Sequence, residues 1–340
     1  MTKIRKLYFF DKKNAGEMIS FLNNGDSCLS RIVFNPLIPI HYLLPIKFKF
    51  LPESYVLKEE KEIKGIITVT PSRCPIKQVE IQNLLFEENC YSDAEELIQY
   101  VVSRYKAMGT ASVIVRIDDY LPELVKLFVY KCGFSQISYE KLWEVPPASS
   151  ILNKNYDKKM FREFRNSDAA FVSGLYNEQL LSHFRPLLGK EVREFKDLVF
   201  KGLSYFSEYK YIYRNNSSKN ISACLSIKTS DNENYILDII QSSWEDIDID
   251  ELISFAYAKI TKRKHNAKLF VKTERYNQQG ELYEKLFLEK NFNCIQNKLI
   301  LTNSSARVIK TEEHERKFTV LGQFYGGGGV TNKVWIKNKL

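Results

Sequence analysis

Histidine and cysteine are the residue types in this sequence whose spacing bears most directly on chemistry. The four histidines follow no H-E-x-x-H or similar metal-ligand spacing and offer no local pairing that indicates a Ser-His-Asp or Cys-His triad. The six cysteines are scattered, with no Cys-x-x-Cys pair. The sequence therefore predicts no metal site, and it indicates a reduced, cytoplasmic setting.

Four consecutive glycines, 326–329, raise a second possibility, a loop that cradles phosphate. Such a loop continues into a Lys-Ser/Thr step and a helix start, and neither follows here. Apolar residues alternate on both sides of the glycines within 317–340. We therefore predict two strands around a flexible turn, in a β-rich C-terminal extension at 304–340.

Length and composition limit the class of protein. A chain of 340 residues is long enough for two domains, and 44% apolar with 27% charged residues is typical of globular proteins. The most apolar region, 31–51, is interrupted by three prolines and carries charges, so no membrane span is expected. The net charge of +9 comes without a basic block interleaved with aromatics, which favours a solvated surface over nucleic-acid binding.

The elements that would position any active residues occur twice in the same order. The phrase LFVYKCGF at 127–134 returns as LFLEKNF at 286–292, and hydrophobic periodicity predicts matching elements around both. In the first copy, the predicted strands are 6–10, 54–60, 63–72, 78–89, 112–117 and 135–145, and the helices 11–24, 92–109 and 121–134. In the second copy, the strands are 161–165, 208–215, 220–230, 235–241, 267–274 and 294–302, and the helices 167–180, 190–203, 249–264 and 281–292. The offset is 155 residues at the first strand and in the central helix and 158 at the end of the last helix, which indicates a duplication.

This order of strands and helices resembles the GNAT superfamily of N-acyltransferases over residues 1–145 and 159–303. The resemblance implies an α+β fold of two GNAT-like units, each a mixed, mostly antiparallel sheet flanked by helices. We expect the units at 1–148 and 159–303, a linker at 149–158 and the extension at 304–340. The resemblance also implies an acyl-CoA co-substrate, acetyl-CoA or another, bound where each sheet splays after its fourth strand.

In GNAT enzymes the CoA pyrophosphate rests on a Q/R-x-x-G-x-G/A loop at a helix N-terminus, where free N–H groups and the helix dipole attract anions. Alignment on the apolar pair Leu97–Ile98 places Asn89, Ser92 and Ala94 on this loop in the first unit. Ser92 and Ala94 are small enough for phosphates to approach the backbone. The resemblance also assigns Leu85, Phe86 and Asp93 to CoA binding. Residues 92–95, SDAE, equally fit a capping box that only starts a helix, and Asp93 would repel a pyrophosphate.

The matching loop of the second unit, 244–249, has bulky residues at both small positions and no basic residue. Its aspartates favour the helix N-terminus and disfavour a phosphate at the same place. We therefore expect the second unit not to hold CoA in the usual way.

Catalysis in GNAT enzymes is direct attack of an amine on the thioester, which needs a base, an oxyanion donor and an acid. The resemblance assigns the base to Glu80, the oxyanion N–H to Leu84 and the acid to Tyr130. Glu80 and Tyr130 each lie one residue away from the position that the family uses. A solvent-facing strand glutamate and a packing aromatic are the simpler interpretations. In the second unit Phe287 takes the tyrosine's place, with Tyr283 one helical turn earlier.

Three functions therefore stay open. The first is an N-acyltransferase that moves an acyl group, acetyl above all, from CoA to an amine-bearing acceptor, with the better CoA site in the first unit. The second is a Fem-like aminoacyl-tRNA-dependent transferase, which leaves tRNA as a conceivable partner although 249–292 is too compact for the coiled arm of that family. The third is a non-catalytic tandem scaffold that binds a partner protein.

Overall fold

The computed structural model describes residues 2–7, 11, 52–60, 62–72, 77–87, 90–147, 151, 155–197, 207–215 and 221–304. The predicted helix at 11–24, apart from Asp11, and the predicted hairpin of the C-terminal extension lie outside these residues. We call residues 1–147 the first half and 155–304 the second half. No helix within the described ranges combines the length and apolarity that crossing a bilayer requires.

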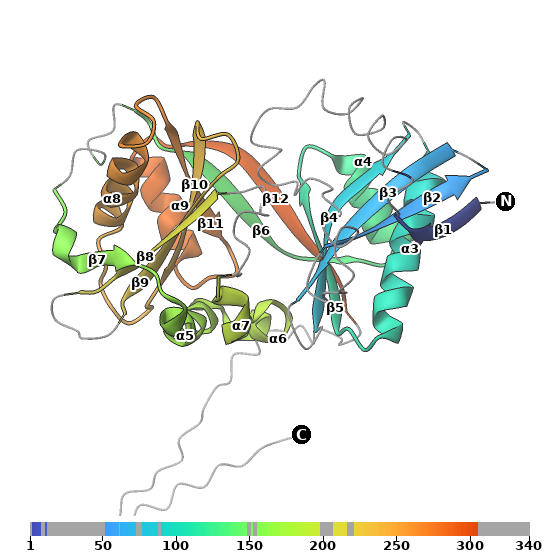
Figure 1. Ribbon diagram of the computed structural model, residues 1–340, viewed down its shortest axis with the longest axis horizontal. Helices are drawn as coiled ribbons and strands as arrows, with labels where there is room; N and C mark the ends of the chain where they lie inside the picture. Colours follow the sequence, from blue (N-terminus) through green and yellow to red (C-terminus); the bar gives the residue numbers. More distant parts are fainter. Residues whose placement is uncertain are drawn as a thin grey trace, which may run out of the picture. The chain divides into compact units, whose positions relative to one another are not determined.

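A single mixed sheet runs through both halves of the described chain (Figure 1). Its strands carry apolar, β-branched residues at alternating positions, as strands buried on one or both faces require. In sheet order they are β1 (Thr2–Lys6), β2 (Glu53–Glu59), β3 (Glu62–Pro71), β4 (Gln78–Phe86), β5 (Ser112–Asp118), β12 (Asn293–Ser304), β6 (Ser135–Glu144), β11 (Lys268–Glu274), β10 (Asn234–Gln241), β9 (Ala223–Thr229), β8 (Ser207–Tyr213) and β7 (Phe161–Glu163).

The two halves exchange their last strands. β12, from the end of the second half, pairs antiparallel with β5 of the first half, and β6, from the end of the first half, pairs antiparallel with β11 of the second. β6 and β12 also pair with each other between these ladders, so they cross between the halves side by side (Figure 1). Neither half completes its sheet without a strand of the other.

One face of the sheet is covered by a helix set in each half. In the first half these helices are α3 (Tyr91–Ala107), α4 (Pro122–Lys126) and the π-helical turn η3 (Leu127–Lys131); in the second they are α8 (Ile249–Thr261) and α9 (Gly280–Glu289). α3 buries Ala94, Leu97, Ile98, Val101 and Tyr105, a spacing that places all five on one side of the helix. These side chains form the first-half core with alternate residues of β2 to β5, and α8 and α9 form an equivalent core in the second half.

The opposite face is covered in the second half by short helices: η6 (Asn166–Asp168), α5 (Ala169–Gln179), η7 (Ser182–Phe184), α6 (Arg185–Leu188) and α7 (Val192–Phe195), after η5 (Lys158–Met160). Their side chains reach past the boundary between the halves. Tyr176 and Phe184, with the leucines around them, pack in one cluster with Ile114 of β5 and Ile300 of β12. This cluster ties the second half's helices to the first half's sheet.

The predicted fold class, α+β with a duplicated arrangement of mixed sheet and flanking helices, is confirmed for the described residues. Most predicted strands match observed ones within a few residues. The helix predicted at 190–203 ends at Phe195, because the backbone of Lys196 is extended. The helix predicted at 121–134 divides into an α-helical turn and the π-helical turn η3.

Candidate functional site

Each half contains a split between two parallel strands. β4 and β5 pair only along 78–81 and 112–115, and β10 and β11 only along 234–237 and 268–271. Beyond these residues the strands continue without pairing, and the N-terminus of α3 or α8 follows the longer strand. In the first half a bulge helps to separate the strands, because Gln82 is skipped in the ladder between β3 and β4.

The structure places Glu80, Leu84 and Tyr130 apart from one another. Val79 and Ile81 face the α3 core, so Glu80 lies on the opposite face of the sheet, where it forms an ion pair with Arg116. Leu84 packs against the α3 core. The Tyr130 side chain, on η3, is 80% exposed. Glu80 and Tyr130 therefore do not share one cavity wall in this structure.

The residues assigned to CoA binding surround the start of α3. Phe86 packs its ring 5.5 Å from that of Tyr91, while Leu85 packs on the other face of the sheet. Ser92 is exposed, Asp93 is half-buried and Ala94 is fully buried in the core; Asn89 lies outside the described residues.

The predicted capping box at 92–95 is wrong. α3 begins at Tyr91, so Cys90 holds the N-cap position and Ser92 already lies in the first turn. From there its hydroxyl cannot cap the helix, and it contacts the Asp93 carboxylate at 3.5 Å. The N-terminus of α3 has no side-chain cap.

The N-terminus of α8 differs in this respect. Asp248 is its N-cap residue and accepts a hydrogen bond from the backbone N–H of Asp250 at 3.0 Å. Asp250 in turn forms an ion pair at 2.5 Å with Lys290, the residue that follows α9. Carboxylates of the chain itself therefore occupy the place where an anion would otherwise bind.

A pocket lies at the split between β10 and β11. It encloses about 410 Å³ of empty space, part of it open to solvent. Its lining comprises Asp238 and Ile239 of β10, Val271 to Glu274 of β11, Gln179, Ile249, Asn277, and Gln279, Gly280 and Tyr283 of the α9 start. Gly280 is needed for this geometry, because a Cβ there would lie 2.2 Å from the carbonyl oxygen of Glu274. The Tyr283 hydroxyl donates to Gln279 at 3.1 Å, and burial raises the pKa of Tyr283.

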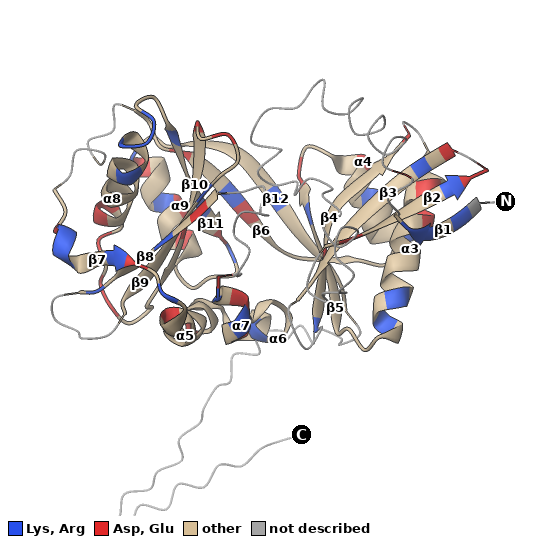
Figure 2. Ribbon diagram, in the orientation of Figure 1, with Lys and Arg blue, Asp and Glu red and all other residues tan. Residues whose placement is uncertain are grey.

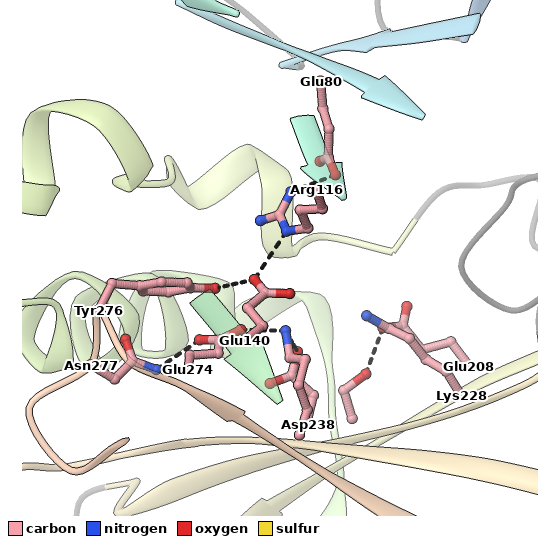
Figure 3. Close-up of polar contacts among 11 residues, drawn as sticks. Glu80, Arg116, Glu140, Glu208, Lys228, Asp238, Glu274, Tyr276 and Asn277 are labelled. Atoms are coloured by element: carbon pink, nitrogen blue, oxygen red, sulfur yellow. Dashed lines mark hydrogen bonds and ion pairs between the residues drawn. The ribbon is translucent and has the colours of Figure 1, made fainter. Parts of the chain in front are cut away.

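Charged side chains form a row on the face of the sheet that α5 and α6 cover. In Figure 3, Arg116 and Tyr276 both point at Glu140 of β6: the Arg116 Nε lies 3.0 Å, and the Tyr276 hydroxyl 2.8 Å, from its Oε1. Arg116 also contacts Glu80, so the row joins β4, β5 and β6. Figure 2 shows it as blue and red segments that interrupt the strands around β6, β10 and β11.

The row continues into the second-half pocket. Lys272 lies between two carboxylates, with its Nζ 3.4 Å from Asp238 and in close contact with Glu274. The Asn277 amide donates to the other oxygen of Glu274 at 2.7 Å (Figure 3). The ion pairs therefore extend from the first-half strand β4 to the wall of the pocket in the second half.

The electrostatics keep these groups charged. Burial raises the pKa of Glu140, but Arg116 and Lys272 outweigh it and hold that pKa well below its usual value. Burial likewise lowers the pKa of Lys272, and Asp238, Glu274 and Glu140 outweigh it and raise that pKa well above its usual value. Such fully paired groups hold position more readily than they exchange protons.

Sequence reasoning missed Arg116, Glu140, Asp238 and Lys272. Arg116 and Asp238 interrupt the largely apolar segments SVIVRI and YILDIIQ, whereas Glu140 and Lys272 lie among other charged residues in EKLWEV and KLFVKTE. A charge inside a strand that is buried on both faces was the available signal, since such charges are nearly always paired.

Comparison with solved structures identifies the architecture. A tandem GNAT protein from the clavulanic acid biosynthesis pathway aligns with 90% of this chain and 99% of its own, with a TM-score of 0.61 and 9% identity. The chain has a tandem GNAT fold. A GCN5-related N-acetyltransferase from Sphaerobacter thermophilus is also similar, with 89% and 95% covered, a TM-score of 0.55 and 10% identity. No protein-family model and no curated protein matches the sequence.

The two strand splits of this tandem GNAT fold are the places where the family's architecture implies an acyl-CoA. The α3 N-terminus, without a side-chain cap and beside the small residue Ser92, fits a pyrophosphate. The α8 N-terminus, capped by Asp248, does not fit one.

Proposed function

We propose that this protein is an N-acyltransferase that transfers an acyl group from acyl-CoA, acetyl-CoA in the first instance, to an amine. The β4/β5 split of the first half would hold the CoA. The tandem GNAT fold supports the reaction class, and its similarity to a tandem GNAT protein and to an N-acetyltransferase is consistent with it. The capped α8 N-terminus supports the choice of half.

The contrast between the two helix N-termini carries this proposal. At α3 the N-cap residue Cys90 supplies no side-chain acceptor, and its carbonyl oxygen accepts from the N–H groups of Asp93 and Ala94. Among the described residues this leaves the N–H groups of Tyr91 and Ser92 for an anion. At α8 the carboxylate of Asp248 fills that role, and Glu245 and Asp246 precede it. A pyrophosphate would gain hydrogen bonds at α3 against the repulsion of Asp93 alone in the first turn, whereas at α8 it would meet several carboxylates.

Within this proposal the backbone N–H of Leu84 stabilises the oxyanion and Glu80 serves the amine, whereas solvent takes the place of the exposed Tyr130, the acid that the resemblance assigns. Protonating Glu80 would weaken its ion pair with Arg116. A water held by Glu80 is therefore the better immediate base, with the carboxylate fixing its position. The exposure of Tyr130 brings solvent equally close to the leaving thiolate.

A non-catalytic scaffold is the second candidate. The ion-paired Glu80 and the exposed Tyr130 favour it, because a carboxylate committed to an ion pair and a hydroxyl open to solvent are poor candidates for a base and an acid. This function predicts no turnover of any amine with acetyl-CoA, whereas the first predicts thiol release.

Calorimetric titration with acetyl-CoA tests the proposed function. Ser92→Glu adds a carboxylate at the exposed first turn of α3 and should abolish binding while leaving the fold intact. The matched control is Trp244→Glu, which adds the same charge at an exposed position of the second-half loop. Equal losses in both variants, or no binding of acetyl-CoA by the unmodified protein, would refute the assignment.

A further inference from the structure

We infer that the second-half pocket is a binding site of its own, for a small hydroxylated primary amine and not for CoA. This goes beyond the proposed function, which gives the second half no ligand. The pocket, the charge of its walls, the loop that contacts its lining and two unpartnered polar atoms carry the inference.

The walls of the pocket carry more negative than positive charge. Asp238 and Glu274 are its two carboxylates, and Lys272 between them is its one cation. Lys272 is committed to both, at 3.4 Å from Asp238 and in close contact with Glu274. Counted over the lining residues alone, two carboxylates face one cation in a partly enclosed space, which favours a cationic ligand.

The loop that follows β10 contacts the pocket lining and carries two further carboxylates. Its Ser242 carbonyl accepts from the pocket residue Gln279 at 3.4 Å, and its Ser243 hydroxyl donates to Glu178 at 2.8 Å. Glu245 and Asp246 follow directly, and within the described residues neither has an ion-pair partner. One oxygen of Glu245 is buried with no hydrogen-bond donor among these residues. An unneutralised, partly buried carboxylate favours a cation beside it.

Trp244 lies on the same loop and is 85% exposed. An exposed indole next to two carboxylates suits the recognition of an ammonium group through its ring face. The same carboxylates, with Asp248 at the N-cap of α8, repel phosphate. The features that exclude CoA from this half are therefore those that attract an amine.

Two polar atoms of the lining indicate the rest of the ligand. Gln179 is only 4% exposed, and its oxygen accepts from the backbone N–H of Gln241 at 3.2 Å, which fixes the amide orientation. Its Nε2 then has no acceptor among the described residues. The Oδ1 of Asn277 likewise has no donor among them. A ligand with hydroxyl groups supplies both an acceptor and a donor. An amino sugar or amino alcohol combines these with the ammonium group.

Paired titrations of the full chain test the inference. Glucosamine and glucose differ by an ammonium in place of a hydroxyl, and ethanolamine and ethylene glycol form a second pair. We expect saturable calorimetric binding of an amine and none of its uncharged counterpart, with affinity falling as salt is raised. The fluorescence of Trp244 should change on binding, and Trp244→Phe should remove that change. Absence of binding by both amines, or equal binding within each pair, would overturn the inference.

A loop variant and its matched control separate this site from the CoA site. Glu245→Gln with Asp246→Asn should weaken amine binding by about tenfold or more, because both changes remove uncompensated charge. Asp93→Asn at the start of α3 should leave it unchanged. Saturating acetyl-CoA should not displace the amine, and Ser92→Glu should lose acetyl-CoA while retaining the amine. Unaltered affinity in the loop variant, or displacement by acetyl-CoA, would contradict a separate amine site even if the proposed function holds.

Discussion

At the scale of single residues, Glu140 is the group on which most of the buried charge depends. It accepts from Arg116 and Tyr276, and Lys272 lies close enough to help to lower its pKa. A carboxylate held in this way stabilises the fold only while it is ionised. Loss of the negative charge of Glu140 would leave the buried positive charges of Arg116 and Lys272 less well neutralised.

We therefore expect Glu140→Gln to lower the free energy of unfolding at pH 7 by about 3 to 5 kcal/mol. The pKa of Glu140 is lower in the folded state than in the unfolded state, where it is about 4.3. The contribution of Glu140 to the free energy of unfolding is therefore complete above the unfolded pKa and is lost as pH falls toward the folded pKa. Urea unfolding at pH 7, 5 and 3 measures this. The difference in free energy of unfolding between parent and variant should be constant from pH 7 to 5 and become smaller below pH 5. A difference that stays constant down to pH 3 would contradict this prediction.

The second residue-scale prediction concerns Glu80. Glu80→Gln keeps the shape of the side chain and removes its ability to position a base, so turnover with acetyl-CoA and an amine should fall about 10²-fold at neutral pH. Rate should recover at high pH, where the free amine is abundant. Tyr130→Phe, at an exposed hydroxyl, should change turnover by less than about twofold. Unchanged turnover of Glu80→Gln across the pH range would favour a substrate-assisted reaction.

At the scale of elements, α3 and α8 show how similar helices start differently. Asp248→Ala removes the N-cap of α8 and should lower the free energy of unfolding by about 0.5 to 2 kcal/mol, as measured by chemical denaturation. Ser92→Ala is the comparison, and should change it by less than about 0.5 kcal/mol because α3 has no side-chain cap. A larger effect at Ser92 than at Asp248 would reverse the assignment of the two N-termini.

The elements themselves were largely predictable, but their partners were not. Alternating apolar residues predicted β3, β5, β9 and β10 because burial imposes that pattern locally. The exchange of β6 and β12 leaves no local trace, since both strands follow a similar helix. Packing decides it: Trp143 of β6 donates to Thr273 at 2.9 Å and packs 6.0 Å from Phe287, both in the second half.

The candidate site was predicted less well than the fold. Alignment with the GNAT pattern assigned Glu80 as the base and Tyr130 as the acid. It could not show that the two residues lie on different sides of the sheet. The ionic row was missed because alternation alone presents Arg116 and Glu140 as solvent-facing. In the structure α5 and α6 cover that face, and only tertiary packing reveals such a cover.

At the scale of the whole molecule, the strand exchange makes the halves interdependent. A first-half fragment, 1–150, lacks β12 beside β5 and exposes Trp143; a second-half fragment, 151–340, lacks β6 beside β11. We expect each fragment alone to aggregate or to lack cooperative unfolding, because an unpaired central ladder exposes backbone and apolar surface. Co-expression should restore a soluble complex that unfolds in one transition. Two fragments that fold cooperatively on their own would refute this interdependence.

The exchanged strands also indicate how such a chain could have arisen. The order β5, β12, β6, β11 has the symmetry of a homodimer whose two subunits each lend the other a last strand. Joining the end of one subunit to the start of the next through the 146–158 segment turns that dimer into one gene product without moving any strand. Once fused, the copies no longer had to be identical. One helix N-terminus could stay free for phosphate while its counterpart acquired carboxylates, so the ancestral symmetry survives in the sheet and has been lost at the two clefts.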